Sequence, residues 1–257
     1  MQRHQHLVKS LFLQREVVLE LYCTAGDPEV LLLMNDGQDL PLLLSAIPDS
    51  VWVLGIHAGL QRRQEYGTAG ILDYQGQGRL AGQYTRFVIG ELLPFLTAQY
   101  PDAVFKRRAF AGCSLGGLSA LDIVWRHPEI FQLAAVFSGA LWWRSRALDA
   151  GYRNDRDRIM HRLIREGSYQ PGLQFFFECG TADETADRNH NGIIDSIDDT
   201  RDLLAELERK GYEATALHYL EIPGGRHDIP TWKTAMEVLL QLPFFSGKTA
   251  ADIKASS

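Results

Sequence analysis

The sequence predicts an α/β protein with a mostly parallel central sheet and helices on both faces, a three-layer αβα sandwich. Short apolar runs between turn residues alternate with longer segments whose apolar residues recur every three or four positions. A strand–helix–strand order requires parallel pairing, and strands buried on both faces are apolar throughout. The 257 residues, 46% hydrophobic and 23% charged, suit one large domain over residues 1–245. The small polar tail, 246–257, is expected to fray.

Three strands are expected early in the chain, at 17–22, 30–34 and 51–56. A long helix should follow over 79–100, and Pro94 should kink or shorten it, because proline lacks the N–H that a helix needs. Beyond it, strands and helices alternate. The strands are expected over 108–111, 133–137, 173–179 and 215–222, and the helices over 115–126, 155–165, 200–210 and 231–240.

Composition excludes several classes of partner. The formal net charge is −6 and no dense Lys/Arg cluster occurs, which argues against a nucleic acid or an anionic membrane. No signal-peptide core and no run of about 20 apolar residues is present, so no membrane-spanning helix is expected. Cys23, Cys113 and Cys179 have no paired spacing and should be buried free thiols. These features predict a cytoplasmic protein and leave its oligomeric state open.

The segment 112–116, Gly-Cys-Ser-Leu-Gly, matches the pattern G-x-S-x-G between an expected strand and an expected helix. In this context the serine lies on a sharp strand-to-helix turn, and the glycines allow neighbouring backbone to approach. Ser114 would then present its hydroxyl as a nucleophile at the carboxyl edge of the sheet. The N–H of Leu115, at the start of the helix, would point at a developing oxyanion.

His227 is the expected general base, because in this arrangement the acid and then the histidine follow the serine along the chain. It lies in a glycine-rich loop, 223–228, between an expected strand and the last helix. Five other histidines lie in the polar N-terminus, at a helix end, or inside an expected helix or strand: His4, His6, His127, His161 and His218. The other interpretation of His227 is a surface histidine without a catalytic role.

The orienting acid is expected directly after the apolar strand 173–179. Asp183 follows the closing glycine, Gly180, by three residues, where a carboxylate can reach Nδ1 of the histidine. Glu184 is the nearest rival, because its longer side chain could take the same role. A carboxylate at this position can also simply stabilise a turn. We predict that the acid is Asp183.

These motifs together resemble the putative-esterase family of α/β-hydrolases, which includes enterochelin esterases, esterase D/S-formylglutathione hydrolases and bacterial feruloyl esterases. Seven segments carry the resemblance, in the order that the family shows: 35–38, 62–66, 91–95, 112–117, 138–143, 179–183 and 224–227. The resemblance implies the α/β-hydrolase fold and a carboxylic ester hydrolase. It assigns the roles of nucleophile, acid and base to Ser114, Asp183 and His227. The implied partner is a small-molecule ester, and no cofactor is implied for catalysis.

The resemblance also implies further site residues. Gln38, in the loop after the strand 30–34, would supply the second oxyanion N–H. Trp142 and Trp143 follow the strand 133–137, where related proteins use aromatic side chains to wall the acyl or alcohol pocket; packing in the core is the other interpretation. Arg62 and Glu65 are expected to form a structural ion pair near the site.

The segment 187–198 matches a twelve-residue calcium loop with glycine at its sixth position. The candidate ligands are the side chains of Asp187, Asn189, Asn191, Asp195 and Asp198 and the backbone carbonyl of Ile193. The other interpretation is an Asn-Gly turn followed by an aspartate that caps the next helix. A bound ion, calcium ahead of magnesium, would be structural and would hold the loop that follows the predicted acid.

The predicted reaction is acyl transfer in two steps, with a siderophore, feruloyl, acetyl or short acyl ester as substrate. Two alternatives remain open. An acyltransferase or an amidase would use the same three residues with another acceptor or another substrate bond. A catalytically silent relative would act as a binding module, although the intact serine, histidine and aspartate argue against it.

Overall fold

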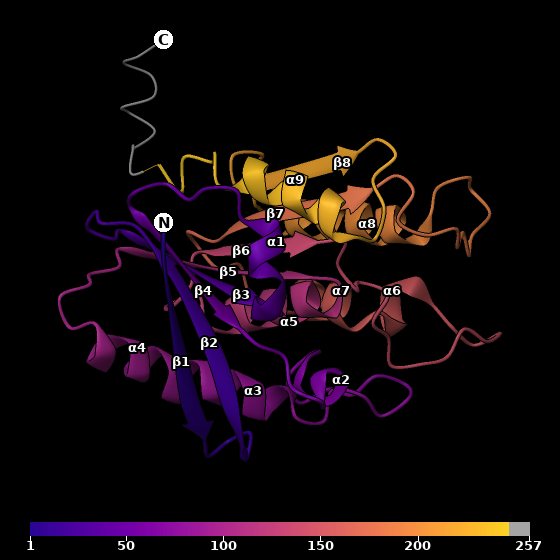
Figure 1. Ribbon diagram of the computed structural model, residues 1–257. Helices are drawn as coiled ribbons and strands as arrows, with labels where there is room; N and C mark the ends of the chain where they lie inside the picture. Colours follow the sequence, from indigo (N-terminus) through magenta and orange to yellow (C-terminus); the bar gives the residue numbers. More distant parts are fainter. Residues whose placement is uncertain (247–257) are drawn as a thin grey trace, which may run out of the picture.

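The computed structural model describes residues 1–246, so the predicted tail lies outside the described residues except for Ser246. Eight strands form one sheet in the order β1-β2-β4-β3-β5-β6-β7-β8 (Figure 1). The strands are β1 (Gln2–Ser10), β2 (Arg15–Cys23), β3 (Val30–Asn35), β4 (Val51–Ile56), β5 (Arg107–Cys113), β6 (Leu133–Phe137), β7 (Gln174–Gly180) and β8 (Leu217–Ile222). Strand β2 pairs antiparallel with β1 and β4, and all other pairs are parallel. The predicted mostly parallel sheet is confirmed.

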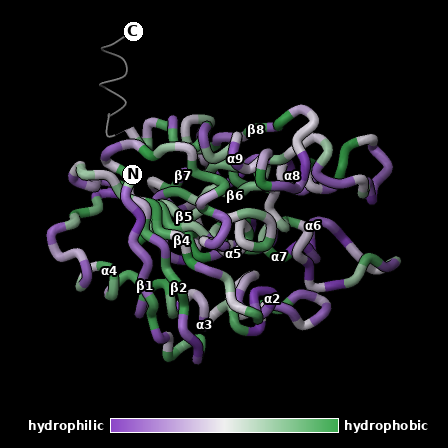
Figure 2. Tube along the Cα trace, in the orientation of Figure 1, coloured by the Kyte–Doolittle hydropathy of each residue, from purple (hydrophilic) through white to green (hydrophobic). Residues whose placement is uncertain are grey.

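Helices cover both faces of the sheet, which gives the three layers visible in Figure 1. On one face lie α1 (Leu40–Leu43) and α9 (Ile229–Leu239); on the other lie α3 (Ala81–Phe87), α4 (Leu93–Gln99), α5 (Leu115–Arg126), α7 (Ile159–Glu166) and α8 (Asp195–Lys210). Two one-turn helices, α2 (Arg62–Glu65) and α6 (Asn154–Asp157), lie in connecting segments. The central strands form the hydrophobic middle of the molecule (Figure 2), because their alternate side chains enter the two cores on either side.

The helix predicted over 79–100 is continuous, but its hydrogen-bond pattern changes part of the way along. A π-helical segment, η2 (Val88–Leu92), joins α3 to α4, and Pro94 is the second residue of α4. Proline cannot donate a backbone hydrogen bond, and a wider turn before it accommodates the missing bond. The proline therefore alters the helix without ending it.

Three elements differ from the prediction. Strand β1 forms where a polar terminus was expected; most of its side chains are exposed, so its hydrophobic pattern is weak. Helix α8 begins at Asp195, five residues earlier than predicted. The helix predicted over 155–165 is divided into α6 and α7 at Arg158, whose backbone is extended. The Arg158 guanidinium explains the break, because it donates to Asp199 at 2.5 Å and to Asp202 at 2.6 Å on α8.

Candidate active site

The predicted elbow lies between β5 and α5. Ser114 has φ 54° and ψ −123°, a backbone conformation that a residue with a side chain adopts only under strain. A Cβ at Gly112 would come closer than 3.0 Å to the backbone of Gly116, so the turn requires glycine there. The N–H of Ser114 donates to the carbonyl of Phe137 at 2.8 Å and ties the turn to the end of β6. Ser114 is thus held at the carboxyl edge of the sheet.

His227 and Asp183 lie together at this edge. His227 Nδ1 is 3.4 Å from Asp183 Oδ2; the side chain of Asp183 is 1% exposed and that of His227 is 43% exposed. A buried carboxylate beside Nδ1 favours one tautomer and one orientation of the ring. Glu184 instead accepts a hydrogen bond from the N–H of Ser196 at 2.6 Å, at the start of α8. The contacts therefore favour Asp183 over its rival.

Within residues 1–246, no hydrogen bond joins the imidazole of His227 to the hydroxyl of Ser114. In enzymes without substrate, such bonds are often long and tighten only when substrate binds. The ring of His227 lies in the loop between β8 and α9 and is 43% exposed.

Asp183 has a support that the sequence did not reveal. Its Oδ1 accepts a hydrogen bond from Ser138 Oγ at 2.9 Å, and Ser138 Oγ accepts one from Trp232 Nε1 at 2.9 Å. The Trp232 ring also packs edge-on against the ring of His227, with centroids 5.1 Å apart and planes at 83°. Trp232 thus contacts the ring of His227 directly and supports Asp183 through Ser138. Ser138 follows β6 and Trp232 lies in α9, so no local pattern connects them.

A second carboxyl group, that of Glu178 in β7, lies close to Asp183. It is 0% exposed, and neither carboxyl oxygen has a hydrogen-bond partner in the described structure. Burial and the charge of Asp183 raise the pKa of Glu178 to about 8, and the nearby polar groups of Ser138 offset only part of this rise. Glu178 lies in a strand that was predicted only from its apolar residues, and no role was predicted for it.

The loop after β3 packs on the elbow. Asn35 Nδ2 donates to the carbonyl of Gly116 at 2.7 Å. Gln38 lies in the single 3-10 turn η1 (Gly37–Asp39) that follows. Leu115 is the first residue of α5, so its N–H has no acceptor inside the helix. Leu115 thus follows Ser114 directly, and the loop that holds Gln38 contacts the elbow through Asn35 and Gly116; the role of both N–H groups stays a prediction.

Arg62 and Glu65 do not pair with each other, contrary to the expectation. Arg62 forms a two-point ion pair with Asp36, at 2.6 and 2.7 Å, and Glu65 forms one with Arg15, at 2.7 Å on both sides. The reason is that α2 has only one turn and lies between the end of β3 and the start of β2, each of which supplies an opposite charge. Arg62 thereby anchors the loop that packs on the elbow.

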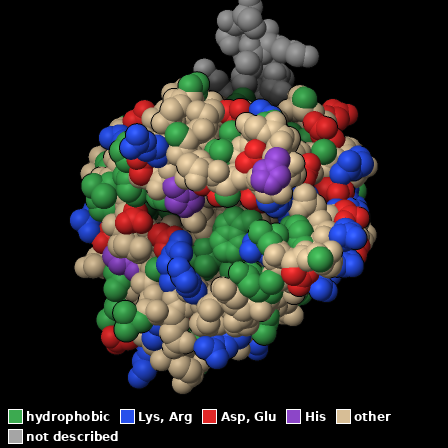
Figure 3. Space-filling view, turned by 90° about the vertical axis from the view of Figure 1, so that its right-hand side faces the viewer, with side chains coloured by type: hydrophobic (Ala, Val, Ile, Leu, Met, Phe, Trp, Pro, Cys, Tyr) green, Lys and Arg blue, Asp and Glu red, His purple; other side chains and the backbone are tan. Residues whose placement is uncertain are grey.

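The two tryptophans after β6 have different surroundings. Trp143 is 2% exposed, and its Cζ2 lies against Gly67 and Gly78, where a Cβ would be 2.9 and 3.1 Å away. Trp142 is 41% exposed, and the guanidinium of Arg144 lies 5.7 Å from its ring. Figure 3 faces this edge of the molecule and shows a recessed hydrophobic surface between histidine and basic side chains. Trp143 is therefore a core residue, and only Trp142 is exposed enough to border a substrate.

Four of the predicted calcium ligands lie close together. Asp198 Oδ2 accepts hydrogen bonds from the side-chain amides of Asn189 and Asn191, both at 2.8 Å. Asp187 accepts from the N–H of Gly192 at 2.9 Å, and Gly192 has φ 84°, which supports the predicted sharp turn. The side-chain nitrogens of both asparagines face Asp198, whereas their oxygens accept backbone N–H groups of the loop, so calcium would require both amides to turn.

Asp195 faces a cation instead. Its carboxylate lies 3.2 Å from the guanidinium of Arg188, which also bonds to Asp199. Among residues 1–246, no three His, Cys, Asp or Glu side chains are arranged to hold a metal ion. Calcium would therefore require Asp195 to leave Arg188, and the site stays a prediction, as does the backbone ligand Ile193. The other interpretation, an aspartate that caps the next helix, is wrong, because α8 begins at Asp195 and the residue before it is Ile194.

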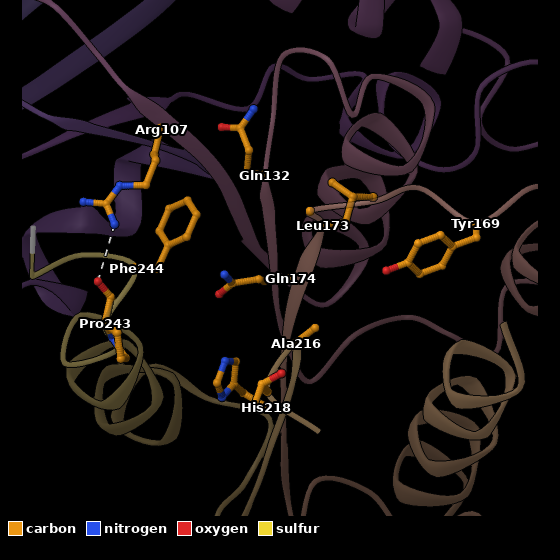
Figure 4. A pocket seen from close by; sticks show the side chains of 11 residues that line it. Arg107, Gln132, Tyr169, Leu173, Gln174, Ala216, His218, Pro243 and Phe244 are labelled. Carbon is orange, nitrogen blue, oxygen red and sulfur yellow. Dashed lines mark hydrogen bonds between the residues drawn. The ribbon is translucent and has the colours of Figure 1, made fainter. Parts of the chain in front are cut away.

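A separate cavity of about 720 Å³ lies at the opposite edge of the sheet, where β5, β7 and β8 begin. Arg107 and Phe244 lie on one side of it and Tyr169 on the other, with His218 also in its wall (Figure 4). None of the predicted catalytic residues lines this cavity. The candidate active site is therefore at the carboxyl edge alone.

Two expectations from composition can be compared with the structure. All three cysteines are buried and free, as predicted. None of the helices in the described residues has the length and apolar character needed to cross a membrane.

Comparison with known proteins identifies the family and the fold. The family model described as "Putative esterase" matches residues 42–241. The solved enterochelin esterase from Shigella flexneri superposes with a TM-score of 0.71 at 18% identity, over 95% of this chain and 59% of that one. An IroE-like serine hydrolase from Shewanella oneidensis gives 0.65 at 17% identity, over 93% and 79%. A ferulic acid esterase gives 0.64 at 17% identity, over 96% and 97%.

This chain spans less than two thirds of the enterobactin esterase chains that it matches. No curated protein matches it by sequence. The family model covers more than three quarters of its 257 residues, and the solved structures share its sheet and helices. The chain therefore belongs to the putative esterase family and has the α/β-hydrolase fold.

Proposed function

We propose that the protein is a serine esterase whose catalytic residues are Ser114, His227 and Asp183. The observation that carries the proposal is the approach of His227 Nδ1 to the buried Asp183, at the sheet edge where Ser114 occupies a strained elbow. In this arrangement Asp183 orients the imidazole and stabilises its protonated form.

The reaction proceeds in two steps through an acyl-enzyme. His227 accepts the Ser114 proton as Oγ attacks the ester carbonyl, and the alcohol leaves with a proton from the same ring. The backbone N–H groups of Leu115 and Gln38 bind the oxyanion; the loss of one such donor typically costs about 3–4 kcal/mol of transition-state stabilisation. Water activated by His227 then releases the acid.

Replacing Ser114 by alanine tests the proposal directly. We expect S114A to lower kcat on a short p-nitrophenyl ester by about 10⁴-fold or more and to abolish labelling by a fluorophosphonate probe. Ser45→Ala, which removes an exposed hydroxyl bonded to Glu237, is the matched control and should leave both readouts unchanged. Wild-type turnover in S114A would refute the assignment.

The proposed substrate is a small-molecule ester. The solved neighbours are named for enterobactin, ferulic acid and siderophore esters, and the recessed hydrophobic surface in Figure 3 suits an aromatic or acyl group. A panel of siderophore lactones, feruloyl and acetyl sugars, S-formylglutathione and short acyl esters would identify the class. Added alcohols or amines would reveal an acyltransferase by its products, because transfer would replace hydrolysis.

A structural calcium ion in the loop 187–198 and a cytoplasmic location are two further parts of the proposal. The first is supported by the sharp turn at Gly192 and by the proximity of Asp187, Asn189, Asn191 and Asp198. The second is supported by three buried free thiols, which suit a reducing compartment.

A further inference from the structure

Glu178 is a buried carboxyl group that the proposed mechanism does not use. Alternation along β7 places it on the same face as Phe176, beneath the side of the sheet that α9 covers. It is 0% exposed, and neither Oε1 nor Oε2 has a hydrogen-bond partner in the described part of the chain. An ionised carboxylate without donors is strongly disfavoured at such a position.

The donors near Glu178 are already committed elsewhere. The Ser138 hydroxyl has one proton; because it accepts from the indole N–H of Trp232, that proton goes to Asp183. The backbone N–H of Ser138 donates to the backbone carbonyl of Glu178, at 2.8 Å. Asp183 thus accepts a hydrogen bond from the Ser138 hydroxyl and lies beside the imidazole of His227. The carboxyl group of Glu178 has neither this hydrogen bond nor a neighbouring imidazole.

Two neighbouring buried carboxyl groups cannot both ionise without a large cost, so one of them keeps its proton. The distribution of donors decides that Asp183 carries the charge and Glu178 the proton. Burial and the charge of Asp183 raise the pKa of Glu178 to about 8. The other titratable group near it on this face is the thiol of Cys113 on β5, whose pKa is raised by burial. The thiol of Cys179 points to the opposite face, where it contacts Thr200 on α8.

We propose that Glu178 is a positioning residue, which stays protonated so that Asp183 alone carries the negative charge that orients His227. The inference rests on the proposed catalytic residues. When Glu178 loses its proton to solvent, a second negative charge repels Asp183. The new carboxylate also competes for the hydroxyl proton of Ser138. His227 then loses its orienting acid, and the rate of acyl transfer falls.

The test is the pH dependence of kcat and KM for wild type and Glu178→Gln, whose carboxamide is similar in shape and cannot ionise. We expect kcat of wild type to fall about tenfold per pH unit above pH 8 with little change in KM, as for the loss of one proton. E178Q should match wild type at pH 7 and keep that rate at pH 9. The control Glu206→Gln, at an ion pair on α8, should keep the wild-type profile.

The outcomes separate this inference from the proposed function. If S114A abolishes turnover but E178Q shows the same alkaline decline as wild type, Glu178 has no such role. If the wild type itself is unreactive toward esters and the fluorophosphonate probe, the proposed function fails.

Should E178Q not fold, carbon NMR of wild type labelled at glutamate carboxyl carbons gives the same answer. We expect one glutamate carboxyl carbon to titrate near pH 8. If no glutamate carboxyl carbon titrates above pH 7, the inference is overturned.

Discussion

Replacing Glu178 by glutamine should also change how stability depends on pH. The pKa of this carboxyl is about 8 in the folded protein, against an ordinary value of 4.5. Between these values the folded chain keeps a proton that the unfolded chain releases. The free energy of unfolding of wild type therefore falls as pH rises through this window, by up to about 1.4 kcal/mol per pH unit. Below pH 4.5 the stabilisation from the protonated Glu178 carboxyl is fully present, and above pH 8 no further stability is lost through this group.

The magnitude follows from the two pKa values. Between pH 5 and pH 8, this single group should lower the free energy of unfolding of wild type by about 3–4 kcal/mol. The carboxamide of E178Q has no proton to release. The variant should therefore lack this loss and gain about 3–4 kcal/mol relative to wild type over the same interval.

Urea unfolding followed by circular dichroism at pH 5 and pH 8 measures the effect. The comparison is the difference in free energy of unfolding between the two proteins at each pH. E206Q is the control: the pKa of Glu206 is lowered by its ion pairs with Arg165 and Arg209, so it should not gain stability on going to pH 8. An E178Q–wild-type difference that is the same at both pH values would refute the reasoning.

Three further outcomes are expected. Gly112→Ala should reduce activity at least about 100-fold or prevent folding, because its Cβ would overlap the backbone of Gly116 and displace the elbow; activity and circular dichroism together check this. Asp199→Asn should cost about 3–5 kcal/mol in urea unfolding, because it leaves the buried guanidinium of Arg158 short of negative charge; a loss below about 1 kcal/mol would contradict it. Millimolar calcium should raise the melting temperature and a chelator should reverse the rise, whereas Asp198→Ala should show no response; an unchanged melting temperature in wild type would count against the loop 187–198 as a calcium site.

The sequence by itself determined the elements whose signal is local. Continuous apolar runs predicted the buried strands of the sheet, and α5 begins and ends where its periodicity and the elbow indicate. Ser114 could be named because a strained strand-to-helix turn needs glycine at fixed neighbouring positions. His227 and Asp183 could be named because each follows a strand end, and the carboxyl ends of parallel strands meet at one edge.

Contacts between side chains of remote segments could be seen only in the folded structure. The hydrogen bonds from Trp232 to Ser138 and from Ser138 to Asp183 join three segments remote in the chain, and nothing in their local sequence marks them. The sequence shows Glu178 as a charged residue in an apolar strand, but its missing donors and its nearness to Asp183 are visible only in the structure. Arg62 pairs with Asp36, which directly follows β3 and is remote from Arg62 in the chain. Side-chain periodicity reports how each segment meets the core, whereas ion pairs and proton positions depend on distances between segments remote in the chain.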